Sequence, residues 1–303
     1  MRKQILGTWL TALSLLAAIG LAVAQQPQFS VELVRTFDHP GSESFLDRTG
    51  AINSRADIAG TLSQEGGFSG GFILFGDGRF SQPLSYPGAM QTSLIGINDD
   101  RETCGFYIGS DGAPHGFLDS HGTLTSYDVV GSISTTVTGV NNSGDFAGNY
   151  QSPTGIFLEG YVSLGGNFSS IDIPGEVGTV AGGINNPGQV VGFSLDQNFF
   201  TTHGFLRAQN GALTYPIDYP GTDVAGTDPE AINDRGVVVG NWIDNSGIEH
   251  GLVVQMSTNT FVTFDISGAS STAFTGINNS GIMVGQYYLN GLYHGFIARL
   301  RPQ

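Results

Sequence analysis

Charged side chains concentrate in two stretches of this sequence, and Trp242 follows the second. The candidate ligand-binding residues are Glu43, Asp47, Arg48, Asp223, Asp228, Glu230 and Trp242. Carboxylates beside an aromatic face can bind a sugar, a cationic peptide or a Ca²⁺-assisted ligand. Two suitably spaced carboxylates can also hydrolyse a glycosidic bond, and Asp47, Asp228 and Glu230 are the candidates for that chemistry. Ordinary loop variation on an acidic surface is the competing explanation.

Histidines form a second recurring set. Four of the six occupy equivalent places, at His115, His203, His250 and His294. They could form a ring of metal ligands, or each could cap a strand by bonding to a nearby Asp or to the backbone. We favour the structural role, because histidines on strands far from a common axis cannot converge on one ion.

Most recognised catalytic signatures are missing from the sequence. It contains no H-E-x-x-H, P-loop or D-x-[DN]-x-[DN]-G calcium loop, and a G-x-S-x-G pattern occurs once, at 67–71, where it overlaps the block equivalent to His-Gly-Phe-Leu. We therefore expect no catalytic residue set of a known kind and no cofactor, with Ca²⁺ as the one ion that the acidic residues could hold. An enzyme remains the alternative to a binding protein.

The elements that must position these residues come from six internal repeats. Each is anchored by a small residue, Ile or Val, and Asn, followed by apolar residues and Gly; the anchors are Asn53, Asn98, Asn141, Asn185, Asn233 and Asn278. We expect these Asn residues to occupy turns, with their side chains bonded to the local backbone. A His-Gly-Phe-Leu block or a relative follows each anchor, as at 115–118 and 203–206. A third block ends most units with an apolar residue, Asp and a Gly turn, as at 264–268.

Each unit of about 45 residues offers four short apolar runs separated by turn residues, which is typical of a β-propeller blade. We predict an all-β fold, a six-bladed β-propeller of four-stranded blades that occupies residues 25–303. The last unit lacks the third block, whereas residues 37–41 carry a spare copy after a strand-like segment, 29–36. We expect this N-terminal strand to complete the sixth blade and remove an unpaired edge. An open solenoid would instead need capping units.

The repeats resemble the extracellular family named HAF, after its His-Ala-Phe tripeptide. The tripeptide appears here as His-Gly-Phe at 115, 203 and 294 and as His-Gly-Leu at 250. The resemblance covers most of residues 30–300 and implies a repeat fold without implying shared catalytic residues.

Differences between the repeats point to the site. Thr lies six residues before five of the anchors, but Asp47 takes this place in the first repeat. The loops that lead to Asp47 and to Thr227 are longer than the equivalent loops elsewhere. Aromatic residues occur in or beside loops on the same predicted face: Phe68, Tyr107, Tyr150, Phe199, Phe200, Trp242, Tyr287 and Tyr288.

Residues 1–24 are typical of a secretory signal peptide, with Arg2 and Lys3 before an apolar run and an A-x-A site that ends at Ala24. An uncleaved membrane anchor is the alternative. The mature chain would hold nine Arg, no Lys and 26 acidic residues, a net charge of −17. This acidity argues against nucleic acid as a partner. Cys104 has no partner for a disulfide and replaces an apolar residue, so we expect a buried thiol.

These patterns predict a secreted or periplasmic monomer that leaves the membrane once the signal is removed. It would act as a binding or scaffold module for an extracellular polysaccharide or a cationic ligand. The alternative is a polysaccharide hydrolase or lyase that uses paired carboxylates on the loop face.

Overall fold

The computed structural model describes residues 29–40, 44–64 and 69–302, which form 23 β-strands and no helix. In the described residues there is accordingly no helix that could cross a membrane. The predicted signal peptide lies outside the described residues. Consecutive strands of each repeat pair in an antiparallel manner, so the predicted all-β, four-stranded character is confirmed.

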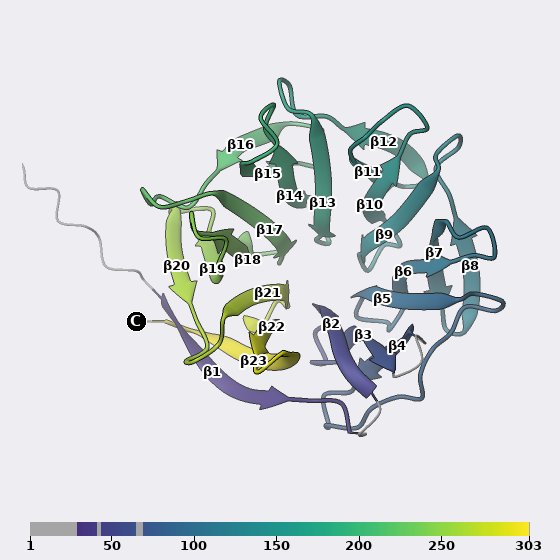
Figure 1. Cartoon of the computed structure of the whole chain (residues 1–303), viewed down its shortest axis with the longest axis horizontal. Helices are drawn as coiled ribbons and strands as arrows, with labels where there is room; N and C mark the ends of the chain where they lie inside the picture. Colours follow the sequence, from purple (N-terminus) through teal and green to yellow (C-terminus); the bar gives the residue numbers. More distant parts are fainter. Residues whose placement is uncertain (1–28, 41–43, 65–68, 303) are drawn as a thin grey trace, which may run out of the picture.

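The first strand of each repeat lies nearest the centre of the molecule (Figure 1). These strands are β2 (Ser44–Ile52), β5 (Gln91–Ile97), β9 (Ser134–Val140), β13 (Gly178–Ile184), β17 (Gly226–Ile232) and β21 (Ser271–Ile277). Each ends just before its anchor Asn, so the six Asn residues gather at one end of the central axis. We call this the lower end and the opposite one the upper end.

The remaining strands follow outward in chain order. The second strands are β3 (Ile58–Gln64), β6 (Thr103–Ile108), β10 (Phe146–Gln151), β14 (Val190–Leu195), β18 (Val237–Ile243) and β22 (Ile282–Leu289). The third strands are β4 (Ser69–Leu74), β7 (Pro114–Ser120), β11 (Glu159–Leu164), β15 (Thr202–Arg207), β19 (Glu249–Gln255) and β23 (Leu292–Pro302). The outer strands are β8 (Thr123–Tyr127), β12 (Asn167–Ile171), β16 (Leu213–Ile217) and β20 (Thr260–Phe264).

The outermost strand beside the sixth repeat comes from the other end of the chain. Strand β1 (Phe29–Phe37) pairs with β23 in an antiparallel manner, from Phe29 opposite Pro302 to Phe37 opposite Gly295. The purple and yellow strands lie side by side in Figure 1. The segment that resembles the missing third block starts at Phe37, the last residue of β1.

The first repeat departs from the four-strand pattern. After β4, only two isolated bridges continue the sheet, from Leu74 to Phe80 and from Gly71 to Leu84. Pro83 lies between the two bridging positions, and a proline cannot donate to a ladder of backbone hydrogen bonds. The predicted fourth strand is thus reduced to two contacts here.

The block that contains His-Gly-Phe packs one repeat against the next. Its aromatic or aliphatic residue is almost completely buried in every repeat, at Phe72, Phe117, Tyr161, Phe205, Leu252 and Phe296. The preceding glycine allows the close approach: a Cβ at Gly71 would lie 2.5 Å from the Leu94 side chain of the second repeat. Cys104 is fully buried, and this burial raises its pKa to about 12, as expected for a structural thiol.

Candidate functional site

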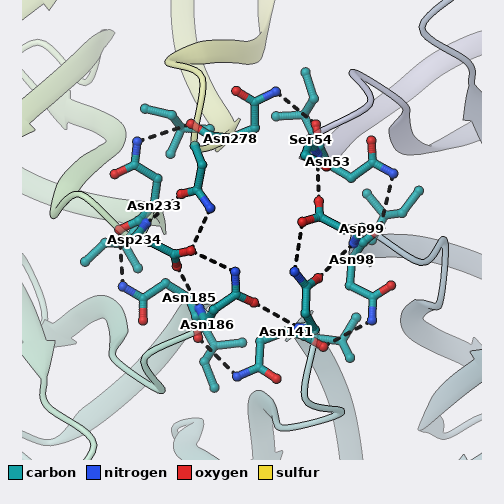
Figure 2. A pocket seen from close by; sticks show the side chains of 18 residues that line it. Asn53, Ser54, Asn98, Asp99, Asn141, Asn185, Asn186, Asn233, Asp234 and Asn278 are labelled. Carbon is teal, nitrogen blue, oxygen red and sulfur yellow. Dashed lines mark hydrogen bonds between the residues drawn. The ribbon is translucent and has the colours of Figure 1, made fainter.

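The lower end of the axis is held by a closed cycle of hydrogen bonds between the anchor asparagines (Figure 2). The Nδ2 of each Asn donates to the backbone oxygen of the next anchor at 2.9–3.2 Å, and Asn278 donates to Asn53. The six side chains are buried. The sequence analysis predicts a bond from each Asn to its own turn, but it misses this bond between repeats.

Each anchor Asn also folds its own hairpin. In the fourth repeat, Asn185 Oδ1 accepts from Gln189 N at 2.9 Å, and Gly188 has a φ of +75°, which glycine adopts without strain. Every polar group of the side chain is therefore used. The repeated Asn residues are architecture, as their presence in all repeats indicates.

A second polar ring lies beside the first. It consists of the residues that follow the anchors: Ser54, Asp99, Asn142, Asn186, Asp234 and Asn279. Five backbone N–H groups of this ring donate to the side chain of the next member at 2.7–3.0 Å. Burial opposes the ionisation of Asp99, but the Asn142 amide and Ser54 N–H outweigh it and lower the pKa of Asp99. The lower end is therefore occupied by its own hydrogen bonds.

A β-bulge in every inner strand places one residue at the axis. The pairing with the second strand shifts by one residue in each repeat, three positions before the anchor. The residues at this position line a narrow neck of about 90 Å³: Gly50, Ile95, Thr138, Gly182, Glu230 and Thr275. A β-bulge commonly redirects a side chain next to a functional site.

The bulge also explains the glycine that ends the anchor motif. At Gly240, a Cβ would lie 2.0 Å from the backbone oxygen of Asp228 on the bulged strand. No side chain fits there, so the bulge and the glycine are required together. Because the bulged residue itself is free to vary, the fold allows Glu230 at a place where other repeats carry Gly, Thr or Ile.

Above the neck the axis opens into a wider cavity, the upper pocket, of about 420 Å³. Its lining residues are Asp47, Arg48, Ser93, Phe106, Glu230, Asn241, Glu249, Ala273, Phe274, Thr275, Gln286 and Tyr293. The neck and the pocket share Arg48, Glu230 and Thr275, so they are continuous. This volume lies within the range of small-molecule sites, about 300–1,000 Å³.

Three of the predicted site residues meet in the upper pocket. Arg48 Nη2 donates to Glu230 Oε2 at 3.3 Å, which joins the first repeat to the fifth across the pocket. Asp47 is exposed and lies at an extra bulge between Leu46 and Arg48. In the second repeat, Thr92 fixes the equivalent loop because its hydroxyl oxygen accepts a hydrogen bond from Tyr86 N at 2.8 Å. Asp47 lines the pocket instead of holding its loop in this way.

Asp228 lies behind this pocket in an enclosed position. Its burial raises its pKa to about 7, and the Glu230 and Glu249 carboxylates add to this rise. Asp228 Oδ1 and Thr202 Oγ1 are both buried without a hydrogen-bond partner in the described part of the chain. Such unsatisfied atoms are rare inside folded proteins and often mark a functional site.

Glu249 completes the acidic cluster, but it is not among the site residues predicted from the sequence. Burial raises the pKa of Glu249 and also that of Glu230, where Arg48 acts in the opposite direction. Glu249 precedes His250, and Tyr293 holds the equivalent place before His294. A comparison of the residues that precede the His position in each repeat would have found both.

Other predicted residues lie elsewhere. Trp242 stacks between Tyr219 and His250, with ring centroids 4.4 and 4.3 Å apart, and it does not line the upper pocket. Asp223 is exposed on the loop after β16 and is also absent from the lining. Glu43 and Phe68 lie outside the described residues.

The predicted structural role of the repeated histidines is confirmed. Each pairs through Nδ1 with an Asp at 2.7–3.1 Å: His115 with Asp128, His203 with Asp218, His250 with Asp265 and His294 with Asp38. The last pair joins the sixth repeat to the segment after β1. In the residues that the structure describes, no three His, Cys, Asp or Glu side chains are grouped to hold a metal ion.

No known family model matches the chain, and no curated protein matches its sequence. Solved structures do resemble it in shape. A putative TolB from Agrobacterium tumefaciens has a TM-score of 0.56 at 13% identity, over 91% of this chain and 99% of that one. The Aleuria aurantia lectin, solved in complex with Fucα1-6GlcNAc, has a TM-score of 0.54 at 11% identity, over 84% and 93%.

A structure from a study of two prolyl endopeptidases has a TM-score of 0.55 at 10% identity. The match covers 86% of this chain but only 43% of that chain. At these identities the likeness concerns the fold alone. The four-stranded sheets and these neighbours establish a β-propeller-like, all-β repeat fold.

Proposed function

We propose that the mature chain is an exported, single-domain, six-bladed β-propeller that binds an extracellular glycan in its upper pocket. Two sets of contacts support the blade count and the closure. The cycle of anchor Asn bonds returns from the sixth repeat to the first. Strand β1 pairs with β23, and Asp38 supplies to His294 the partner that Asp128, Asp218 and Asp265 supply to the other histidines.

The observation that supports a binding function is the difference between the residues that line the upper pocket and those that line the rest of the axis. The upper pocket gathers side chains that the repeats do not share, whereas the neck narrows to a ring of Ile and Val above the bonded Asn residues. Tyr293 and Phe106 offer apolar ring faces, and Asn241, Gln286 and Glu249 offer hydrogen-bonding groups. This combination suits the two sides of a sugar ring, and the lectin of similar shape supports the same class of ligand.

The test is a glycan array probed with residues 25–303, in the presence and absence of Ca²⁺. Tyr293→Ala removes a pocket aromatic, and Phe200→Ala is the matched control because its ring is 85% exposed and lies outside the pocket lining. We expect Tyr293→Ala to abolish binding and Phe200→Ala to preserve it. Binding that survives Tyr293→Ala unchanged, or that is absent across the array, contradicts the proposal.

A specific observation favours hydrolysis as the second candidate function. Asp228 is enclosed with its pKa near 7, close enough to Glu230 for the two charges to interact. A carboxyl group that stays partly protonated at neutral pH can act as a general acid beside an ionised partner. Release of reducing ends from a bound polysaccharide, lost in Asp228→Asn and kept in Asp223→Asn, would establish it. Binding without release by the wild-type protein would exclude it for that polysaccharide.

A further inference from the structure

The upper pocket holds more negative than positive charge. Asp47, Glu230 and Glu249 line it, whereas Arg48 is the one cationic side chain among the lining residues, and it is already paired with Glu230. Enclosed Asp228 adds a further carboxyl group behind the wall, with an oxygen that accepts no hydrogen bond in the described structure. Carboxylates that repel one another are stabilised by a cationic partner, and the described residues supply one guanidinium here for the three lining carboxyl groups and Asp228.

The arrangement of these carboxyl groups favours an organic cation over a metal ion. A metal site requires several ligand atoms within about 2.0–2.6 Å of one point. Within the described ranges, no three acidic or histidine side chains are grouped in that way. Asp47, Glu230 and Glu249 instead line a cavity of about 420 Å³. A cavity of this size can hold an organic molecule that carries its positive charge on one atom.

The uncharged residues that line the upper pocket indicate what kind of cationic ligand it would bind. Tyr293 is 39% exposed at the mouth of the pocket and is opposite Leu46 on β2, so its ring borders the Asp47 bulge. Asn241 and Gln286 add amide groups, and Gln286 is held by an N–H bond from Thr49 at 3.1 Å. An aromatic face, amides and carboxylates in one cavity match a sugar ring with hydroxyl groups and one ammonium group.

We propose that the upper pocket recognises a saccharide that carries a free primary ammonium group, a deacetylated amino sugar, with Glu249 and Asp47 facing the charged nitrogen. The proposal rests on the proposed binding function and names its ligand. An ammonium nitrogen offers three donors, which suits carboxylate oxygens that line one cavity. An N-acetylated sugar lacks that charge and presents an added methyl group to the acidic wall.

Calorimetric titration with a β-1,4-linked glucosamine trimer and with its N-acetylated counterpart tests this inference. At about pH 6, below the pKa of an ordinary amine, we expect the free amine to bind at least roughly tenfold tighter, as one charge-assisted hydrogen bond would supply. Glu249→Gln should remove most of that preference. Asp223→Asn removes an equal charge from an exposed loop and should keep it. Asp47→Asn, at the exposed bulge, should weaken the preference even if Glu249→Gln fails to fold.

The outcomes separate this inference from the function on which it rests. Equal or tighter binding of the acetylated trimer overturns the ammonium inference but leaves glycan binding in the pocket. The same holds if neither trimer binds while the array reveals another ligand that Tyr293→Ala abolishes. If no glycan binds at all, both proposals fail.

Discussion

The two ends of the central axis are built from the same six strands, yet they differ in almost every respect. At the lower end, all six repeats carry the same residue: each supplies one Asn, and each Asn completes its hydrogen bonds within the protein. At the upper end the residue types differ, and equivalent positions carry Arg48, Ser93, Asp228 and Ala273. One end is a satisfied network, and the other contains an excess of carboxyl groups and, among the described residues, buried oxygen atoms of Asp228 and Thr202 without hydrogen-bond partners.

The difference shows how a repeat fold can separate stability from recognition. Each repeat needs its anchor Asn to bond to the next repeat, whereas the bulge position needs only a backbone shift and a glycine opposite. Variation is therefore tolerated along the upper axis. We therefore expect changes at the repeated residues to alter mainly stability, and changes at the variable residues to alter mainly ligand binding.

The largest effect is expected from deletion of residues 25–40. This removes β1 from the edge of β23 together with the Asp38 partner of His294. We expect the melting temperature to fall by roughly 10 °C or more, since each kcal/mol corresponds to a few degrees in a chain of this size. Deletion of residues 25–28 alone is the control. An unchanged melting curve after the longer deletion would show that β1 does not close the ring.

A smaller but still large effect is expected at the lower end. Asn185→Ala removes the bond to Asn233 O at 3.2 Å and leaves Gln189 N without its acceptor. A loss of about 2–3 kcal/mol in the free energy of unfolding follows from one lost bond and one buried group left unsatisfied. Urea denaturation measures it. Ligand affinity should stay within about twofold of wild type; a large change in affinity would contradict the division between the two ends.

Asp228 is predicted to reduce stability at high pH. Its folded-state pKa of about 7 lies above the unfolded value near 3.8, so the folded state binds more protons between these limits. Stability should fall as pH rises from about 4 to 7. Asp228→Asn mimics the protonated form and should be more stable than wild type at about pH 8, by roughly 1–3 kcal/mol. Parallel pH–stability curves for the two proteins would show that ionisation of Asp228 does not destabilise the fold.

The smallest effect concerns a repeated residue that lies at the upper end. Burial lowers the pKa of His115, but Asp128 and Asp111 outweigh it, so the folded pKa lies above the unfolded value of 6.5. The contribution of the protonated imidazole is complete below pH 6.5 and is lost as pH rises through the folded pKa. Because the group is partly exposed, we expect His115→Asn to cost less than about 1 kcal/mol, and only at low pH. A similar loss at about pH 9 would contradict the charge-based role.

The sequence alone was sufficient for the repeat boundaries, the strand content and the turn role of the Asn residues, because these depend on local patterns. It also placed Asp47, Arg48 and Glu230 in one site, since they break the pattern of the repeats. It could not show that Glu230 faces the axis. A bulge shifts the alternation of a strand by one residue, and its position depends on pairing with a partner strand.

Two further errors of the site prediction also arise because contacts in the tertiary structure decide where a side chain lies. Trp242 is an aromatic residue of the kind that often contacts ligands, but its neighbours Tyr219 and His250 enclose it in a stack that no local pattern specifies. Glu249 and Tyr293 lie near the starts of third strands, and only the packing of the repeats around the axis brings them to the upper pocket. The signal peptide and the resemblance to HAF-type repeats stay predictions.

The most direct test of the account is a crystal structure of the protein with the tightest ligand from the glycan array. We predict that the ligand occupies the upper pocket, with its ring against Tyr293 and a polar group within hydrogen-bonding distance of Glu249 or Arg48. A ligand found at the ring of anchor Asn residues, or on the outer surface near Phe200, would contradict the assignment of recognition to the upper end.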